Sequence, residues 1–194
     1  DDYIAVPDND ALNLGTGDGT WMAWVNCSSF SSNNSVIQKM TSNDNGYKIV
    51  LHTSNRILFQ VGDSSADTNY YNYSDADLIA NEWTHIAVSW DNANQKANFF
   101  INGVKTGVQF GEPRETDTIG DTSNSVELRI GKQSDNESSA VFTGSIASVS
   151  FYKGVEKSES EVYAIYQKGI TYNESSEDKV ENIEDDEETY YSSD

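Results

Sequence analysis

Short runs of β-branched and aromatic residues, joined by polar turns, recur along most of this chain. The connecting stretches are dominated by Asn, Ser, Asp and Thr, which favour turns, and the 194 residues include only two prolines. The runs predicted as strands are Tyr3–Val6, Trp21–Asn26, Val36–Lys39, Tyr47–His52, Ile57–Val61, Thr84–Trp90, Ala97–Ile101, Val126–Ile130 and Ser145–Tyr152. Strands of this length and spacing are typical of antiparallel sheets packed face to face. The sequence therefore predicts an all-β fold, a two-sheet antiparallel β-sandwich.

Two local signals predict a tight hairpin and one short helix late in the chain. Asn102-Gly103 follows a strand-like run and suits a two-residue turn in which both central residues have positive φ. Ser158 and Glu161 have the spacing of a capping box at a helix N-terminus. We expect the helix to end at Gly169, with this glycine in the left-handed conformation.

The composition changes after the expected helix. Residues 1–169 are predicted to form the sandwich domain, and residues 170–194 an acidic C-terminal tail with about ten acidic residues and one lysine. Such a tail cannot pack a core of its own, so we expect it to contact neighbouring subunits in an assembly. The residues predicted to make these contacts are Val180, Ile183, Tyr190 and Tyr191.

The balance of acidic and basic residues indicates which classes of binding partner are disfavoured. The chain has 12 Lys and Arg against 32 Asp and Glu, a formal net charge of −20. Nucleic acid is disfavoured, because phosphate binding needs clustered cations. No apolar run approaches the roughly 18 residues that cross a bilayer, so no membrane insertion is expected. A hydrophobic content of 36% is still enough for one core.

Several segments, taken in order, resemble a laminin-G-like jelly roll of the concanavalin-A-like superfamily. The resemblance covers roughly residues 1–166, and its most specific parts are the Glu82-Trp83-Thr84-His85 segment and the Asn102-Gly103 turn. The other matching segments are Asp2–Asp8, Leu12–Leu14, Thr20–Val25, Gly46–Ile49, Arg56–Gly62, Leu128–Gly131 and Gly144–Tyr152. The resemblance implies the same sandwich that the strand pattern predicts. Fold alone does not give function, because this sandwich carries lectins, hydrolases, adhesion modules and virion proteins.

Catalysis is not expected. Hydrolases of this fold place carboxylates as Glu-x-Asp-x-x-Glu along one strand, so that two acids share a face, and the sequence has no such run. The isolated acids Glu82, Asp91 and Glu127 are predicted to be solvated or to cap turns. His85 is predicted to have a structural role in the sheet.

Calcium is the cofactor that the resemblance implies, bound by oxygens that join the start of the chain to the penultimate strand. Acidic side chains are available near the N-terminus at Asp2, Asp8, Asp10 and Asp18. Family members commonly have Asp after Gly-x-Ile, whereas Gly144-Ser145-Ile146 is followed here by Ala147, so the implied site lacks one ligand. The turns at Asp8 to Asp10 and Asp63 to Asp67 are alternatives, and both also suit plain turn caps.

Aromatic residues are the side chains that stack on sugars, because a pyranose face presents C–H groups to the ring. The segment Tyr70, Tyr71, Asn72 and Tyr73 combines aromatic rings with an amide beside polar loops, and it is the predicted glycan contact. Strand alternation places Tyr70 on the face opposite Tyr71 and Tyr73, so part of the segment is also expected in the core. For the four tryptophans, core packing is expected for at least three.

These features together predict a non-catalytic recognition or adhesion module located extracellularly, at a cell surface or on a virion. The expected partners are a glycan or a surface protein. The alternative is a structural subunit that decorates a viral particle or surface filament, with the tail making the contacts between subunits.

Overall fold

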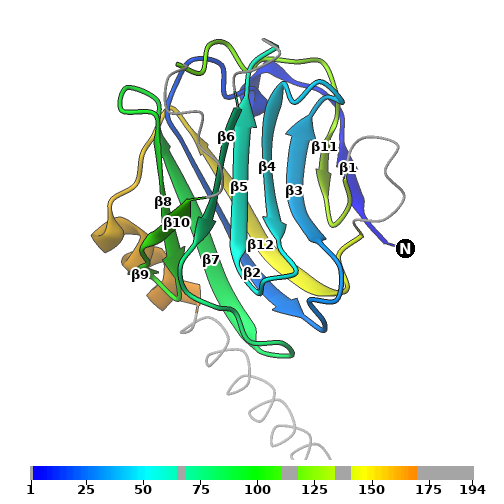
Figure 1. Ribbon diagram of the computed structural model, residues 1–194, viewed down its shortest axis with the longest axis vertical. Helices are drawn as coiled ribbons and strands as arrows, with labels where there is room; N and C mark the ends of the chain where they lie inside the picture. Colours follow the sequence, from blue (N-terminus) through cyan, green and yellow to red (C-terminus); the bar gives the residue numbers. More distant parts are fainter. Residues whose placement is uncertain (1, 65–68, 111–117, 134–140, 170–194) are drawn as a thin grey trace, which may run out of the picture.

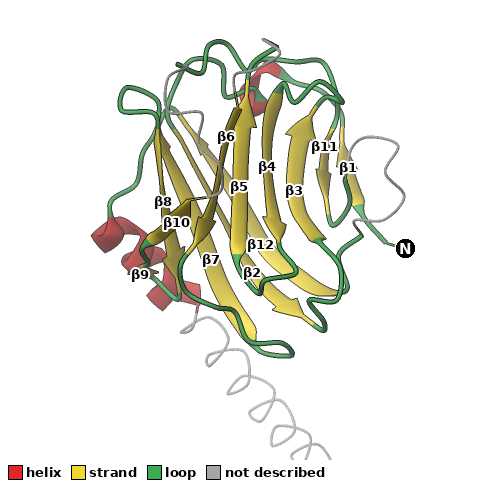
Figure 2. Ribbon diagram, viewed as in Figure 1, coloured by secondary structure: helices red, strands yellow, loops and turns green. Residues whose placement is uncertain are grey.

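The computed structural model describes residues 2–64, 69–110, 118–133 and 141–169, and within them it shows two sheets stacked face to face (Figures 1 and 2). The strands are β1 (Ile4–Val6), β2 (Gly19–Cys27), β3 (Asn34–Met40), β4 (Gly46–Leu51), β5 (Ile57–Gly62), β6 (Asn69–Ser74), β7 (Trp83–Asp91), β8 (Lys96–Ile101), β9 (Val104–Lys105), β10 (Val108–Phe110), β11 (Leu128–Ile130) and β12 (Gly144–Lys153). The larger sheet has the order β1-β11-β3-β4-β5-β6-β10, and the smaller sheet has the order β12-β2-β7-β8-β9. The predicted all-β antiparallel sandwich is confirmed.

The core lies between the sheets and is built from alternate residues of each strand. On β2, Trp21, Ala23 and Val25 point into it, and the Trp21 ring centroid lies 4.8 Å from that of Tyr47 and 5.2 Å from that of Phe59. Successive side chains of a strand point to opposite faces. The residues between these core positions therefore lie on the outer face of the smaller sheet, where the candidate site is found.

The Asn102-Gly103 turn has the predicted geometry. It joins β8 to β9, with Ile101 paired to Val104 across the turn, and its φ angles are 51° at Asn102 and 78° at Gly103. The Asn102 Oδ1 also accepts a hydrogen bond from the His85 backbone N–H (3.0 Å), and the Asn102 N–H donates to the His85 carbonyl (2.8 Å). The turn therefore fixes the backbone of β7 at His85.

A helix at residues 159–169 packs on the outer face of the smaller sheet, beside β8 and β9 (Figure 1). We call it the late helix. Its N-terminus shows the predicted pairing of Ser158 with Glu161: the Ser158 N–H donates to Glu161 Oε2 (2.9 Å), and the Ser158 hydroxyl donates to the same oxygen (2.7 Å). These bonds lower the pKa of Glu161. The prediction for Gly169 is wrong, because this residue is itself helical and does not adopt the left-handed conformation.

The late helix is held to the sheet by a small apolar cluster. Val162 is fully buried against Met22, Ala87 and Phe100, which belong to the outer faces of β2, β7 and β8. Burying a Val side chain contributes about 2 kcal/mol, which exceeds what helix propensity alone would add over one turn. The late helix is therefore part of the folded domain.

Three short strands were not among the predicted ones. β6 consists of Asn, Tyr and Ser only and has no aliphatic residue, β9 has two residues, and β10 alternates as Val-Gln-Phe but is only three residues long, which is too short to predict a strand. β11 begins at Leu128 and is shorter than the predicted strand Val126–Ile130. Among the described residues, no helix has the length and apolar character that a membrane crossing requires.

Candidate functional site

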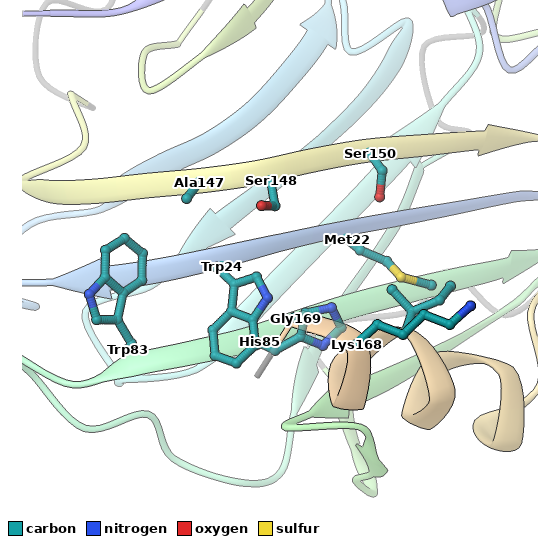
Figure 3. A pocket seen from close by; sticks show the side chains of 10 residues that line it. Met22, Trp24, Trp83, His85, Ala147, Ser148, Ser150, Lys168 and Gly169 are labelled. Atoms are coloured by element: carbon teal, nitrogen blue, oxygen red, sulfur yellow. The ribbon is translucent and has the colours of Figure 1, made fainter. Parts of the chain in front are cut away.

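A hollow of about 460 Å³ opens on the outer face of the smaller sheet (Figure 3). Strands β2, β7 and β12 form its floor, and the end of the late helix forms a wall. We call it the aromatic hollow. Its lining residues are Met22, Trp24, Trp83, His85, Ala147, Ser148, Ser150, Ile165, Lys168 and Gly169.

Strand register brings its aromatic residues together. Trp24 on β2 is paired with His85 on β7, and Trp83 lies two residues before His85 on the same face. The Trp24 and His85 ring centroids are 5.4 Å apart at an angle of 61°. Trp24 is partly buried, whereas Trp83 is 49% exposed. Trp83 therefore offers a large aromatic surface to a ligand.

These positions correct the expectation for the tryptophans. Trp21 and Trp90 are buried in the core, but Trp24 and Trp83 lie on the outer face, so the prediction that at least three pack in the core is wrong. The reason is strand alternation. Trp21 and Trp24 are three residues apart, and Trp83 and Trp90 are seven apart, so each pair is divided between the two faces.

An irregularity in β12 supplies the polar side of the hollow. Ala147 is paired with Trp24 and Ser150 with Met22, so β12 has one residue more than β2 over this stretch. Ser148 has a φ of 51°, in the left-handed region that non-glycine residues seldom adopt. As a result Ser148 and Ser150 both line the hollow, together with Ala147 (Figure 3).

The late helix closes the hollow on one side with Ile165, Lys168 and Gly169, and Tyr166 packs it against Trp24. The Tyr166 ring stacks on Trp24 with centroids 5.6 Å apart, and it lies 5.8 Å from the His85 ring. A Cβ added at Gly169 would lie 2.7 Å from Trp24 Nε1. Glycine is thus the residue that lets the helix backbone approach the indole.

His85 is buried beneath these rings, in keeping with its predicted structural role. Only 2% of its surface is exposed, and Nδ1 has no hydrogen-bond partner among the described residues. Burial lowers the pKa of His85 to about 4. The imidazole is therefore neutral at physiological pH and adds no charge to the hollow.

The charge of the lining is unlike that of the chain as a whole. Lys168 is the charged side chain among the lining residues, and none of those described is Asp or Glu. The groups that can donate hydrogen bonds are the Lys168 ammonium, the hydroxyls of Ser148 and Ser150 and the indole N–H groups. The hollow consequently combines aromatic surface with donors.

The predicted glycan segment is divided between the two faces of β6. Tyr70 points into the sandwich, where its ring centroid lies 4.9 Å from that of Trp90 and its hydroxyl accepts from the Ala97 N–H (3.1 Å). Asn72 is 1% exposed. Tyr73 lies on the outer face beside His52, with ring centroids 5.0 Å apart. The side chain of Tyr71 lies outside the described part of the structure.

The isolated acids are not brought together. Asp91, at the far end of β7 from Glu82, accepts a hydrogen bond from the Asn94 N–H (3.0 Å) and caps that turn, as expected. Bonds from the Asn94 side chain and N–H lower the pKa of Asp91, the opposite of what a general acid needs. Glu127 pairs with Arg129, with Oε1 and Nε 2.6 Å apart.

The predicted calcium ligands make other contacts or lie apart. The Asp8 carboxylate bonds to the buried ammonium of Lys39 (2.7 Å), and Asp18 accepts from the Asn92 N–H (2.9 Å). Asp10 meets β12 at Lys153, whose ammonium donates to the Asp10 carbonyl (2.7 Å), whereas Ala147 lies in the aromatic hollow near the other end of that strand.

Within the described residues, no three or more Asp, Glu, His or Cys side chains form a group that could hold a metal ion. The calcium site that the resemblance implies, with Asp2, Asp8 and Asp10 and the partner position at Ala147, stays a prediction, because backbone carbonyl oxygens can also bind calcium.

The Lys39 ammonium forms a cross-link inside the domain. Besides Asp8 Oδ1, it donates to the Val126 carbonyl (2.7 Å) and to the carbonyl (3.1 Å) and Oδ1 (3.2 Å) of Asn124. These four oxygens come from the N-terminal segment and from the loop before β11. A side-chain cation therefore supplies at Asp8 the positive charge that a bound metal would supply.

The predicted subunit contacts Val180, Ile183, Tyr190 and Tyr191 lie outside the described residues, as do residues 65–67 of the alternative acidic turn. The aromatic hollow itself was not predicted. A signal for it was present, namely the odd spacing of the tryptophans, but the contribution of the late helix could not be inferred from spacing.

Comparisons with solved structures find the same fold in glycan-binding proteins of low sequence identity. The module named CBM40 of a Ruminococcus gnavus sialidase, bound to α2,3-sialyllactose, has a TM-score of 0.59 at 15% identity, covering 86% of this chain and 96% of its own. Botulinum neurotoxin type C, whose cell entry depends on two ganglioside molecules, has a TM-score of 0.61 at 12% identity. The match covers 86% of this chain and 39% of the toxin chain.

A Bacteroides ovatus protein that has been proposed to bind carbohydrate has a TM-score of 0.58 at 16% identity. The match covers 84% of this chain and 44% of that protein. The chain thus spans less than half of two of these three proteins, and at such identities the likeness concerns the fold alone. No curated protein matches the sequence. The family model described as the concanavalin A-like lectin/glucanases superfamily matches residues 1–162. The chain therefore belongs to the concanavalin A-like lectin/glucanases superfamily.

Proposed function

We propose that this domain is a non-catalytic binding module that takes a carbohydrate in the aromatic hollow. The observation that carries the proposal is the half-exposed indole of Trp83, set beside Trp24 and the hydroxyls of Ser148 and Ser150 in one hollow. A pyranose stacks its C–H face on such a ring while its hydroxyls bond to polar side chains. A volume of about 460 Å³ also falls within the range of small-ligand sites, roughly 300–1,000 Å³.

The solved structures of similar fold support a sugar as the ligand. One was determined with sialyllactose, and another belongs to a toxin that depends on gangliosides. Glycans of this kind are displayed outside cells, so the proposal includes an extracellular or surface location. A binding role also agrees with Asp91 and Glu127, whose carboxylates are engaged in a turn cap and an ion pair and are not poised for proton transfer.

A glycan array followed by titration of one substitution tests the proposal. The unmodified chain should bind a subset of glycans, and Trp83→Ala should weaken binding to them by about tenfold or more, since it removes the stacking surface. The matched control is Tyr3→Ala. Tyr3 is a similarly exposed aromatic residue, at 43%, and it lies beside β1 on the larger sheet.

Equal loss of binding in the two variants would place the ligand elsewhere or indicate a general effect on folding. A silent array, with no change in tryptophan fluorescence on adding concentrated sugars, would overturn the carbohydrate proposal and leave a protein surface as the class of ligand to examine.

A further inference from the structure

We infer that the aromatic hollow selects a sugar that carries a carboxylate over its neutral counterpart. This inference rests on the proposed function and names the class of glycan. It starts from the hydrogen-bonding groups of the lining: an ammonium and the indole N–H groups, which only donate, and two serine hydroxyls, which donate and accept. Strong acceptors are few, because the lining holds no described Asp, Glu, Asn or Gln side chain.

A neutral sugar and an acidic sugar place different demands on such a surface. Each hydroxyl of a neutral sugar has a proton to donate, and a lining with few acceptors leaves some of these protons without a partner. A carboxylate has acceptor oxygens only, so a donor-rich lining satisfies it completely. Its hydrogen bonds to an ammonium are also charge-assisted and about twice as strong as neutral ones.

The arrangement of the hollow allows both interactions at once. Figure 3 shows Trp83 at one end and Lys168, on the late helix, at the other, with Trp24 and Ser148 between them. One sugar ring can stack on Trp83 while a carboxylate, on the same or the next sugar, meets Lys168 and the serine hydroxyls. Lys168 is exposed on the late helix, so its ammonium is accessible from solvent.

The net charge of −20 acts at the hollow mainly through acids close to it, because charges in solvent are screened over about 8 Å at physiological ionic strength. Lys168 lines the hollow itself and acts at contact distance, and the lining holds no described Asp or Glu side chain. The cation in the lining therefore favours a carboxylate there.

Matched pairs of sugars test the inference. The unmodified chain is titrated at constant ionic strength with methyl glucoside against methyl glucuronide, methyl galactoside against methyl galacturonide, and lactose against sialyllactose, and binding is followed by tryptophan fluorescence. In at least one pair the acidic member should bind about tenfold more tightly. Lys168→Gln should remove most of that difference, because it weakens binding of the acidic member more than binding of the neutral member.

The control is Lys96→Gln, which makes the same change in net charge at an exposed lysine near the far end of β7, where Lys96 pairs with Asp91. It should leave the difference intact. If both members of each pair bind equally, or the neutral member binds more tightly, the inference is overturned and the proposed function stands. If neither member of any pair binds and the array is silent, the proposed function fails with it.

Discussion

Trp83 and Trp90 show how the position of one residue along a strand decides its role. Both lie on β7, but Trp90 fills the core and Trp83 is half exposed in the aromatic hollow. The same division separates Trp21 from Trp24 on β2. Since alternation follows from backbone geometry alone, these assignments could have been made from the sequence. The expectation of three core tryptophans rests on residue type alone, whereas the odd or even position along the strand decides which face each one occupies.

His85 should make the stability of the domain depend on pH. Its pKa is about 4 when folded, against an ordinary value of 6.5, so the unfolded chain binds more protons between these values. The contribution of neutral His85 to the free energy of unfolding is therefore fully present above pH 6.5. It is lost as the pH falls through 4, and the loss amounts to roughly 3 kcal/mol. Urea unfolding of the unmodified chain and of His85→Phe across this range measures it.

The difference in unfolding free energy between the unmodified chain and His85→Phe isolates the effect of His85, because the other ionisable groups are present in both. The free energy of unfolding should fall more steeply with decreasing pH in the unmodified chain. Parallel pH profiles would show that His85 does not sit in an environment that disfavours its charge.

Lys39 should hold the domain together without calcium. Lys39→Met leaves the Asp8 carboxylate, together with the oxygens of Asn124 and Val126, without the ammonium that now binds them. The expected loss is about 2 kcal/mol or more, moderated by the partial exposure of Asp8. Lys96→Met, at an exposed position, should cost far less.

Thermal unfolding measures the effects of Lys39→Met and Lys96→Met, and it also tests for bound calcium. The unmodified chain should unfold at the same temperature with and without a chelator, because the positive charge at Asp8 is a side chain. A large drop in that temperature with chelator would contradict this account and would revive a metal site built from other oxygens.

At the scale of elements, the late helix is what turns a sheet face into a hollow. Its hydrophobic cluster around Val162 fixes it on the sheet, and Tyr166 and Gly169 bring its end against Trp24. The start of this helix could be predicted from Ser158 and Glu161, because a cap is encoded locally. The place where the helix docks could not be predicted, since it depends on the outward residues of three strands that are distant in sequence.

Gly169→Ala should lower the stability of the domain, although alanine favours helices over glycine by about 1 kcal/mol. The added Cβ would lie 2.7 Å from Trp24 Nε1 and 3.1 Å from Cε2, so the helix end or the indole must move. Thermal unfolding measures the effect. The control is Gly17→Ala, where the added Cβ would make an ordinary contact of 3.6 Å with the Leu14 carbonyl.

A higher unfolding temperature for Gly169→Ala would mean that the helix end is not packed on Trp24. Unfolding temperatures unchanged in both Gly169→Ala and Gly17→Ala would also mean that the helix end is not packed on Trp24. A drop confined to Gly169→Ala supports the packing that forms the wall of the hollow.

At the scale of the whole molecule, the sequence predicts the scaffold well and the site poorly. Most of the strands and the Asn102-Gly103 turn follow from local patterns that each short segment carries by itself, whereas β6, β9 and β10 do not. The β12 irregularity does not, because Ser148 adopts a positive φ that its residue type disfavours. Binding surfaces are generally assembled from such exceptions on a regular scaffold.

The tryptophan indole N–H signals in a ¹H–¹⁵N correlation spectrum report whether a glycan binds in the aromatic hollow, because the chain has four tryptophans, two in the aromatic hollow and two in the core. When a glycan selected on the array is added, the signals of Trp24 and Trp83 should shift in proportion to occupancy. Those of Trp21 and Trp90 should stay in place. Saturable binding that leaves Trp24 and Trp83 unshifted would contradict the account and would direct attention to the outer face of β6 at Tyr73.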